Sequence, residues 1–202
     1  MTSFGEIILW LGVIFPLVFS AGPGNVLCAV CGANNGFKKS IPFILGLNFS
    51  YTLYSLLIGF GLGSILLKFP TIFFIVQLLG VIYIFWLGYK FLIRKEVHTK
   101  ESNTKLTFLD GVISQALNIK GLTIVITMYS QFLNEDSSLS YEVIRLSLLL
   151  LILNLFTHTT WSYGGAWMAQ KFASNYAVQV QSKIFGSMLI LISLWLLFKA
   201  IE

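Results

Sequence analysis

Four consecutive residues interrupt the first apolar stretch of the chain: Gly22, Pro23, Gly24 and Asn25. Proline lacks a backbone N–H and both glycines disfavour a helix, so a helix must end and restart here. The free N–H groups and the positive dipole end of the restarted helix are suited to bind a carboxylate, and Asn25 adds an amide. We interpret the four residues as part of a substrate-binding site; a plain structural kink is the alternative.

A second set of polar residues, Asp110, Asn118 and Lys120, lies in another apolar stretch. A charge near the middle of a bilayer costs roughly 2.5–3.5 kcal/mol, so Lys120 is expected to face a partner or a cavity. We assign Asn118 and Lys120 to the substrate-binding site, where Lys120 binds a carboxylate or titrates during transport. Asp110 is a candidate charge relay that pairs with Lys120 or meets a substrate ammonium; the alternative is a charge at a helix N-terminus.

A histidine, His158, lies within a further apolar stretch. Histidine can relay protons near neutral pH, so we predict a proton or charge relay at His158, with hydrogen-bonded packing as an equal alternative. Four more polar side chains are expected either to line the same cavity or to pack between helices: Asn48, Tyr51, Tyr54 and Gln77.

Cys28 and Cys31 form a C-x-x-C pair, the one pattern here with an enzymatic association. Such a pair can cycle between dithiol and disulfide. Two thiolates fall short of the four ligands of a zinc site, so we expect no bound metal. The main alternative is that both cysteines pack as small apolar side chains.

Sequence motifs of enzymes are missing: there is no Ser-His-acid nucleophile elbow, no phosphate-binding glycine loop and no cluster of metal ligands. We therefore expect a conduit that is not an enzyme and needs no cofactor. Two other functions stay open. One is a membrane thiol-disulfide transporter that uses Cys28 and Cys31, and the other is a non-transporting scaffold packed through the glycine pairs Gly32/Gly36 and Gly59/Gly63.

The composition places these residues in a membrane. Of the 202 residues, 56% are hydrophobic and only 10% are charged, and the mean hydropathy is +0.84. Because a transmembrane helix needs about 20 apolar residues, we predict an all-α polytopic membrane protein. Its six transmembrane helices are expected near residues 6–30, 41–67, 70–92, 108–133, 145–168 and 180–200. The lipid bilayer and a small-molecule substrate are the expected partners, and a homo-oligomer stays open.

The chain is predicted to form one membrane domain over residues 1–202. A polar segment at 94–105 separates a first half, 1–93, from a second half, 106–202, with three spans in each. An odd number of spans inverts the second half relative to the first, which is the geometry of an inverted repeat. We expect each half to contain one broken helix.

The net charge of +5 comes from basic residues in predicted loops and not from a basic surface with interleaved aromatics, so we expect no nucleic-acid partner. The positive-inside rule favours N-out and C-out in the cytoplasmic membrane, with the segment 94–105 in the cytoplasm. The inner segments then hold Lys38, Lys39, Lys90, Arg94, Lys95, Lys100, Lys105, Lys171 and Lys183, and the outer ones hold Lys68, Arg145 and Lys199.

Several of these motifs share one family pattern. Residues 21–25 read Ala-Gly-Pro-Gly-Asn, and residues 80–90 contain Gly, Tyr, Leu-Gly and a final Lys. The fourth and last predicted spans add Phe108, Gly111, Asn118, Lys120 and Gly186. Over nearly the whole chain, these motifs resemble the LysE-type amino-acid exporter family, also called the LysE/RhtB translocators. That family has a Pro-Gly-Pro-Asn-type signature and a fourth span that usually ends in Asn-Pro-Lys.

The resemblance implies secondary export of an amino acid or related small metabolite, driven by the proton gradient or the membrane potential. The substrates of the family vary, so lysine is not implied by its name. Two positions depart from the pattern, because Ala21 and Ile119 stand where the family has prolines. The second departure leaves open whether the fourth helix breaks, with Gly121 as a residue that can compensate.

Overall fold

The computed structural model describes residues 4–62, 70–93, 106–134, 137–171 and 175–201. Within these ranges every regular element is a helix and no strand occurs, so the all-α prediction is confirmed for them. The predicted cytoplasmic loop at 94–105 lies outside the described residues, as do Gly63 and Lys68.

The helices follow one another in the order α1 (Phe4–Phe19), α2 (Pro23–Asn35), α3 (Phe37–Leu57), the short π-helical turn η1 (Ile58–Leu62), α5 (Pro70–Leu92), α6 (Phe108–Ala116), α7 (Ile119–Phe132), α8 (Leu139–Lys171) and α9 (Asn175–Ile201). The helices α3 and α8 begin at Phe37 and Leu139, before the predicted starts of the second and fifth spans at residues 41 and 145. The helix α8 extends past the apolar stretch because Glu142 in its first turn and Lys171 in its last turn complement the helix dipole.

Both helix breaks are present, the predicted first one and the second, which the sequence had left open. The axes of α1 and α2 differ by 61°, and those of α6 and α7 differ by 63°. At the first break Gly22 is extended and Pro23 begins the new helix, where its missing N–H costs nothing. The second break forms although Ile119 replaces the proline, because Asn118 caps the restarted helix. The fourth helix is therefore as sharply broken as the first.

Membrane-spanning capacity follows from helix length and composition. Among the described residues, Phe37–Gly61 and Leu139–Lys171 are each long and apolar enough to cross a membrane, and the two bent pairs raise the number of candidate spans there to as many as four. Within α5 and α9 the described residues give only the shorter apolar stretches Val81–Lys90 and Gly186–Trp195. The structure is that of a polytopic membrane protein, and the six-span arrangement stays a prediction.

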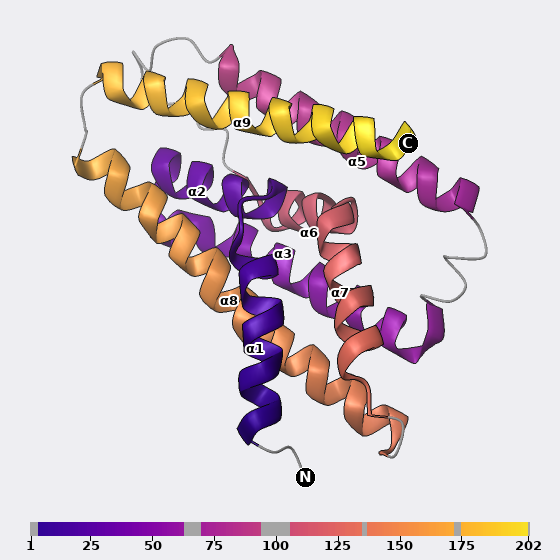
Figure 1. The fold of residues 1–202 in the computed structure, drawn as a ribbon. Coiled ribbons are helices and arrows are strands. Elements are labelled where there is room, and N and C mark those ends of the chain that lie inside the picture. The colour runs from indigo at the N-terminus through magenta and orange to yellow at the C-terminus, as the bar shows by residue number, and fades with distance from the viewer. Residues whose placement is uncertain (1–3, 63–69, 94–105, 135–136, 172–174, 202) are drawn as a thin grey trace.

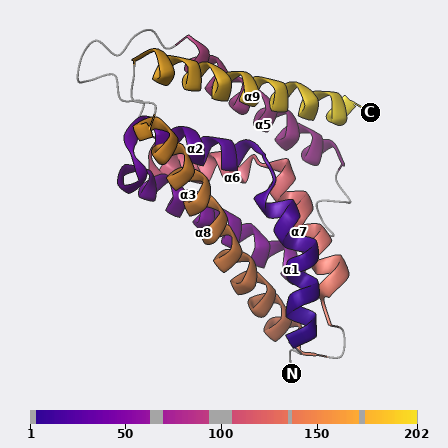
Figure 2. The same ribbon diagram turned by 60° about the vertical axis from the view of Figure 1, so that its left-hand side comes forward.

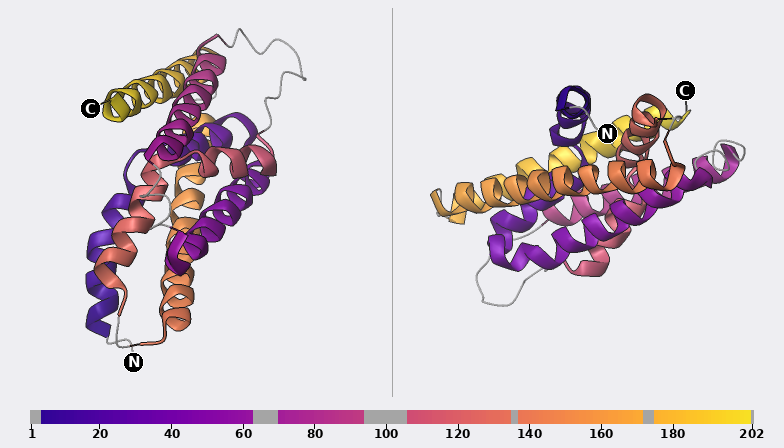
Figure 3. Two further views of the ribbon diagram at one scale, coloured as in Figure 1. Left: turned by 90° about the vertical axis from the view of Figure 1, so that its right-hand side faces the viewer. Right: turned by 90° about the horizontal axis from the view of Figure 1, so that it is seen from below.

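The helices pack in pairs. Figure 1 shows α5 and α9 side by side along one edge, and Figure 2 shows the same pairing from another side. The helices α2 and α8 pack against each other, as do α3 and α6. Figure 3 shows α1 and α7 running together from the breaks toward the N-terminal end of the molecule. Each bent pair thus has one of its helices packed on a long helix, α2 on α8 and α6 on α3.

Glycines allow these helices to touch backbone to backbone. A Cβ added at Gly32 of α2 would lie 1.9 Å from the carbonyl oxygen of Ser162, and one added at Gly165 of α8 would lie 2.0 Å from that of Ala29. Gly46 and Gly111 form the equivalent contact between α3 and α6. The prediction for Gly36 was wrong: nothing lies within 4 Å of its added Cβ, and its φ of +79° makes it the turn between α2 and α3.

The buried apolar side chains of the described residues form two clusters. One joins α2, α3, α5 and α9 and includes Phe43 and Leu189. The other joins α1, α7 and α8 with Tyr51 of α3 and includes Ile14 and Met128.

Candidate functional site

Lys120, in the first turn of α7, reaches across to the C-terminal end of α1. Its Nζ donates to the carbonyl oxygen of Ser20 at 2.8 Å, to Ser20 Oγ at 2.9 Å and to the carbonyl oxygen of Ala21 at 3.5 Å. The last carbonyls of a helix have no partner within it and form the negative end of its dipole. The ammonium group therefore stabilises the end of α1 and joins the two broken helices.

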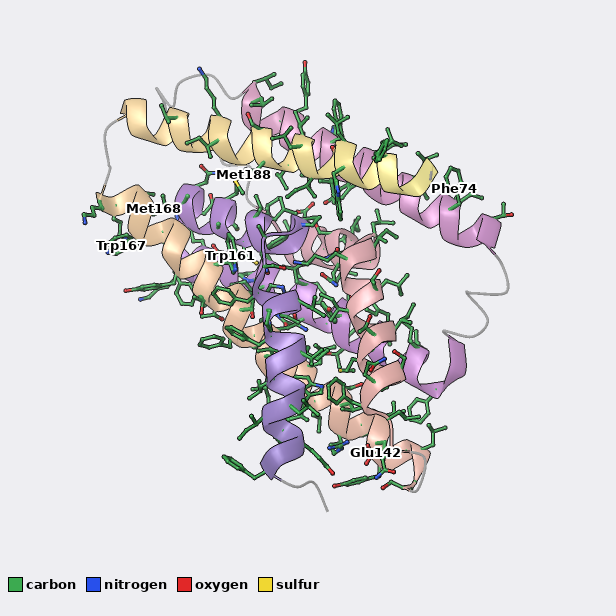
Figure 4. The ribbon with its side chains drawn as sticks, viewed as in Figure 1. Phe74, Glu142, Trp161, Trp167, Met168 and Met188 are labelled. Atoms are coloured by element: carbon green, nitrogen blue, oxygen red, sulfur yellow. The ribbon has the colours of Figure 1, made fainter. Side chains whose placement is uncertain are left out.

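Asn25 and Trp161 also bind carbonyls at this helix end. Asn25 Nδ2 donates to the carbonyl oxygens of Val18 at 2.8 Å and Ser20 at 2.9 Å. Trp161 of α8 donates from Nε1 to the carbonyl oxygen of Phe19 at 3.1 Å, and Figure 4 labels this side chain. Backbone that would be costly in hydrocarbon is thus satisfied inside the protein.

The start of α7 is held by a chain of amide and hydroxyl groups. Asn118 accepts from the backbone N–H of Gly121 at 3.2 Å and donates from Nδ2 to Gln115 Oε1 at 3.1 Å. Gln115 donates in turn to the hydroxyl of Tyr54, and the Tyr51 hydroxyl donates to the carbonyl oxygen of Gly121 at 3.3 Å. The helix α3 therefore holds the second break in position.

A small polar cavity lies between the two breaks and α8. Its volume is about 20 Å³, and its lining residues are Val18, Gly22, Gly24, Asn25, Tyr51, Gln115, Asn118, Lys120, Gly121, Ile124, Asn154 and His158. A cavity that holds one water molecule needs about 10–15 Å³ by this measure. The space therefore admits water and excludes an amino acid, so larger cargo requires the helices to move.

The α8 side of the cavity carries His158 and Asn154. His158 is buried, and its Nδ1 lies 3.1 Å from Nδ2 of Asn48 on α3. Asn154 is 1% exposed and its Nδ2 has no hydrogen-bond partner among the described residues. A buried donor without a partner is costly, which makes this amide available to a ligand or a water molecule.

The structure brings together six of the eight residues that we assigned to the site or the relay. Gly22, Gly24, Asn25, Asn118, Lys120 and His158 all line the cavity, whereas Pro23 is buried in the first turn of α2 and does not. Of the side chains expected beside them, Tyr51 lines the cavity, and Asn48 and Tyr54 bind its lining residues. The side chain of Gln77 lies outside the described ones.

Asp110 lies away from the cavity, at the start of α6. Its Oδ2 accepts from the backbone N–H and from Oγ1 of Thr107, both at 2.7 Å, and its own N–H donates to Thr107 Oγ1 at 3.3 Å. This reciprocal arrangement is a capping box, which corresponds to the alternative of a charge at a helix N-terminus. Asp110 lies in the first turn of α6 and Lys120 lies in the first turn of α7, beyond the break.

Five lining residues were not assigned to the site from the sequence: Val18, Gln115, Gly121, Ile124 and Asn154. Gln115 and Asn154 are polar residues in apolar helices, which is the signal that identified Asn118 and Lys120. Gly121 is needed because an added Cβ would lie 2.3 Å from the Tyr54 hydroxyl.

The cysteine pair lies in a different environment. Cys28 and Cys31 are free and are 0% and 1% exposed. Both belong to the apolar cluster around α2 and α3. Within the described residues no group of three metal-ligating side chains comes together.

Comparison with known proteins gives one family and several relatives. The model of the LysE type translocator family matches residues 8–200. A cysteine/O-acetylserine efflux protein of Salmonella typhi is 26% identical over 144 residues, which cover 71% of this chain and 74% of the relative. The protein of that name in Escherichia coli strain UTI89 is 23% identical over the same shares.

A further relative, an uncharacterized membrane protein of Vibrio cholerae, is 22% identical over 91% of this chain and 93% of its own length. No solved structure matches the chain.

Proposed function

The chain belongs to the LysE type translocator family, and from this premise we propose that it exports a neutral amino acid through the cavity between the two helix breaks. It is a membrane transporter and not an enzyme, since its named relatives are efflux proteins. The observation that carries the proposed site is the convergence of Asn25, Asn118 and Lys120, from two halves of the chain, on one polar cavity.

Lys120 is the proposed ligand of the cargo carboxylate. Its Nζ is already bound to backbone oxygens at the end of α1, which carry only partial negative charge. A carboxylate carries a full charge and forms stronger hydrogen bonds with an ammonium group. Cargo that enters beside Gly22 therefore competes with α1 for Lys120, and its binding loosens the link between α1 and α7.

This competition connects cargo binding to movement. The cavity is too small for an amino acid while Lys120 holds α1, so the carboxylate is bound only when α1 and α7 separate. A site between two broken helices and a rocking of the halves around it would give alternating access. The predicted inverted repeat of three and three spans, with N-out and C-out orientation in the cytoplasmic membrane, is part of this proposal.

The cargo class follows from the charges around the cavity. Among its described lining residues Lys120 carries the positive charge and no side chain is a carboxylate. A cargo with a cationic side chain would add a buried charge without a partner, which is costly. Cysteine and O-acetylserine, which the relatives' names give, are neutral amino acids with small side chains. We propose cargo of this kind, with one of its oxygens accepting from the free Nδ2 of Asn154.

Energy coupling is assigned to His158. It is the titratable side chain of α8 in the cavity wall, and Asn48 orients its ring at 3.1 Å. A histidine in this position can take up and release a proton during transport. Asp110 stays a candidate charge relay only in the first turn of α6, because its side chain does not line the cavity.

Export can be measured with purified protein in liposomes loaded with radiolabelled O-acetyl-L-serine. We expect efflux above that of protein-free liposomes, faster with an inward proton gradient and inhibited by L-cysteine but not by L-lysine. Equal efflux from protein-containing and protein-free liposomes would contradict the exporter and favour the non-transporting scaffold.

The cysteine pair provides a separate arm of this assay. Because Cys28 and Cys31 are buried among apolar side chains, we expect the double variant Cys28→Ala/Cys31→Ala to export O-acetyl-L-serine at close to the wild-type rate. Thiol trapping of the wild type across a range of redox potentials should find both cysteines reduced. A pair that cycles, together with loss of activity in the double variant, would establish the thiol-disulfide transporter instead.

A further inference from the structure

A second and larger cavity, called the outer cavity below, lies at the end of the molecule where α1 begins. The polar cavity between the two helix breaks is called the central cavity. The volume of the outer cavity is about 290 Å³. The start of α1, the end of α7 and the start of α8 form its walls, with Glu6, Trp10, Gln131 and Arg145 among the lining residues. Figures 1 and 3 show these three helix ends at the same end of the molecule, and Figure 4 labels Glu142 at this end of α8.

The charged groups at this cavity retain unused hydrogen-bonding capacity. Arg145 donates from Nη2 to Glu142 Oε2 at 2.5 Å, and Glu142 is 3% exposed. The Nε of Arg145 and the Nε1 of Trp10 are buried without a hydrogen-bond partner in the part of the chain that the structure describes. A guanidinium offers five N–H donors in a planar fork that matches a carboxylate. Across the same cavity, Glu6 offers a carboxylate to an ammonium group.

The two cavities lie along the same three helices. On α1 the outer cavity reaches Trp10 and the central one reaches Val18, eight residues apart. On α7 they reach Gln131 and Ile124, seven residues apart, and on α8 they reach Leu149 and Asn154, five residues apart. These spacings correspond to about 8–12 Å along the helix axes.

One apolar layer separates the two cavities. Between the two cavities lie Ile14 on α1, Met128 on α7 and Leu150 on α8. Their exposed fractions are 0%, 0% and 1%, and all three belong to the same apolar cluster. Residues four apart on a helix share a face, so this layer continues the walls of both cavities.

We propose that the outer cavity is a second binding site for the same zwitterionic amino acid, one layer beyond the central site. Arg145 receives the carboxylate, Glu6 receives the ammonium group, and Trp10 forms an apolar wall. Cargo reaches it from the central cavity when Ile14, Met128 and Leu150 move apart. The proposal rests on the proposed function, because it takes the cargo to be an amino acid.

Protection of an engineered cysteine tests the site. Gln131→Cys puts a thiol in the cavity wall, and Ser130→Cys puts one on the adjacent exposed residue, which does not line it. The wild type, whose own cysteines are buried, sets the background. With O-acetyl-L-serine at ten times its dissociation constant, labelling of Gln131→Cys by a charged thiol reagent should slow by about tenfold. Acetate should not protect, and labelling of Ser130→Cys should not change.

Two further variants locate the bound amino acid. Protection of Gln131→Cys should persist when Lys120→Met removes the central site and should be lost when Glu6→Gln removes the ammonium ligand. Equal labelling of Gln131→Cys with and without amino acid, or protection that disappears with Lys120→Met, overturns the outer site. Efflux from the same wild-type liposomes is scored separately, so an active exporter without protection refutes only the outer site.

Discussion

Replacement of Lys120 by methionine is expected to abolish export. The ammonium is the positive charge in the wall of the central cavity, and methionine keeps a similar length without the charge. A hydrogen bond to a charged group contributes about 1.5–3 kcal/mol, which corresponds to about a 10- to 100-fold loss of cargo affinity. The measurement is the initial rate of O-acetyl-L-serine efflux from liposomes, at a matched amount of folded protein.

Two controls separate cargo binding from the structural role of Lys120 at the end of α1. Ser20→Ala removes one acceptor of the Lys120 ammonium and leaves the charge in place, so it should reduce export little. Thr123→Ala changes an exposed side chain of α7 that bonds only to its own helix and should have no effect. Wild-type efflux from Lys120→Met liposomes, or a loss no larger than that of Ser20→Ala, would remove Lys120 from the binding site.

Gly165→Ala is expected to prevent correct packing of α2 on α8. The new Cβ would lie 2.0 Å from the carbonyl oxygen of Ala29, and backbone on both sides leaves nothing flexible to move away. Overpacking of this kind costs about 1–3 kcal/mol or more, so the unfolding temperature should fall by roughly 2–12 °C. Thermal unfolding in detergent, followed by size-exclusion chromatography, measures the shift.

The neighbouring glycine provides a matched control. Nothing lies within 4 Å of a Cβ added at Gly164, and alanine favours a helix by about 1 kcal/mol over glycine. Gly164→Ala should therefore unfold at the wild-type temperature or slightly above it. Equal stability of the two variants would mean that α2 and α8 do not approach as closely as the structure has them.

The first helix break could be predicted from the sequence because Gly22 and Pro23 act locally. The second was left open by the sequence, since Ile119 stands where the family has a proline. Asn118 supports this break locally, because it caps α7 and binds Gln115. The contact that the sequence could not reveal is that of Tyr51 on α3 with the carbonyl oxygen of Gly121, since sequence spacing carries no information on contacts between distant helices.

Most of the residues that line the site could also be predicted from the sequence, but not all of them. Polar residues in apolar helices have few places to lie other than a shared cavity, which is why Asn25, Lys120 and His158 meet. Asp110 is likewise a polar residue in an apolar stretch, but Thr107, three residues before it, gives it a local hydrogen-bond partner. Gly36 was taken for a packing glycine, although only its positive φ explains its position at a turn.

Carboxylate binding at Lys120 is tested most directly by a solid-state NMR distance. Protein labelled with ¹⁵N at lysine Nζ would be saturated with O-acetyl-L-serine labelled with ¹³C at its carboxylate, with Lys120→Met to assign the signal. We predict that the Lys120 nitrogen and the carboxylate carbon lie within about 4 Å of each other, as a charge-assisted hydrogen bond requires. Bound amino acid without any dephasing of the Lys120 signal would contradict the proposed site.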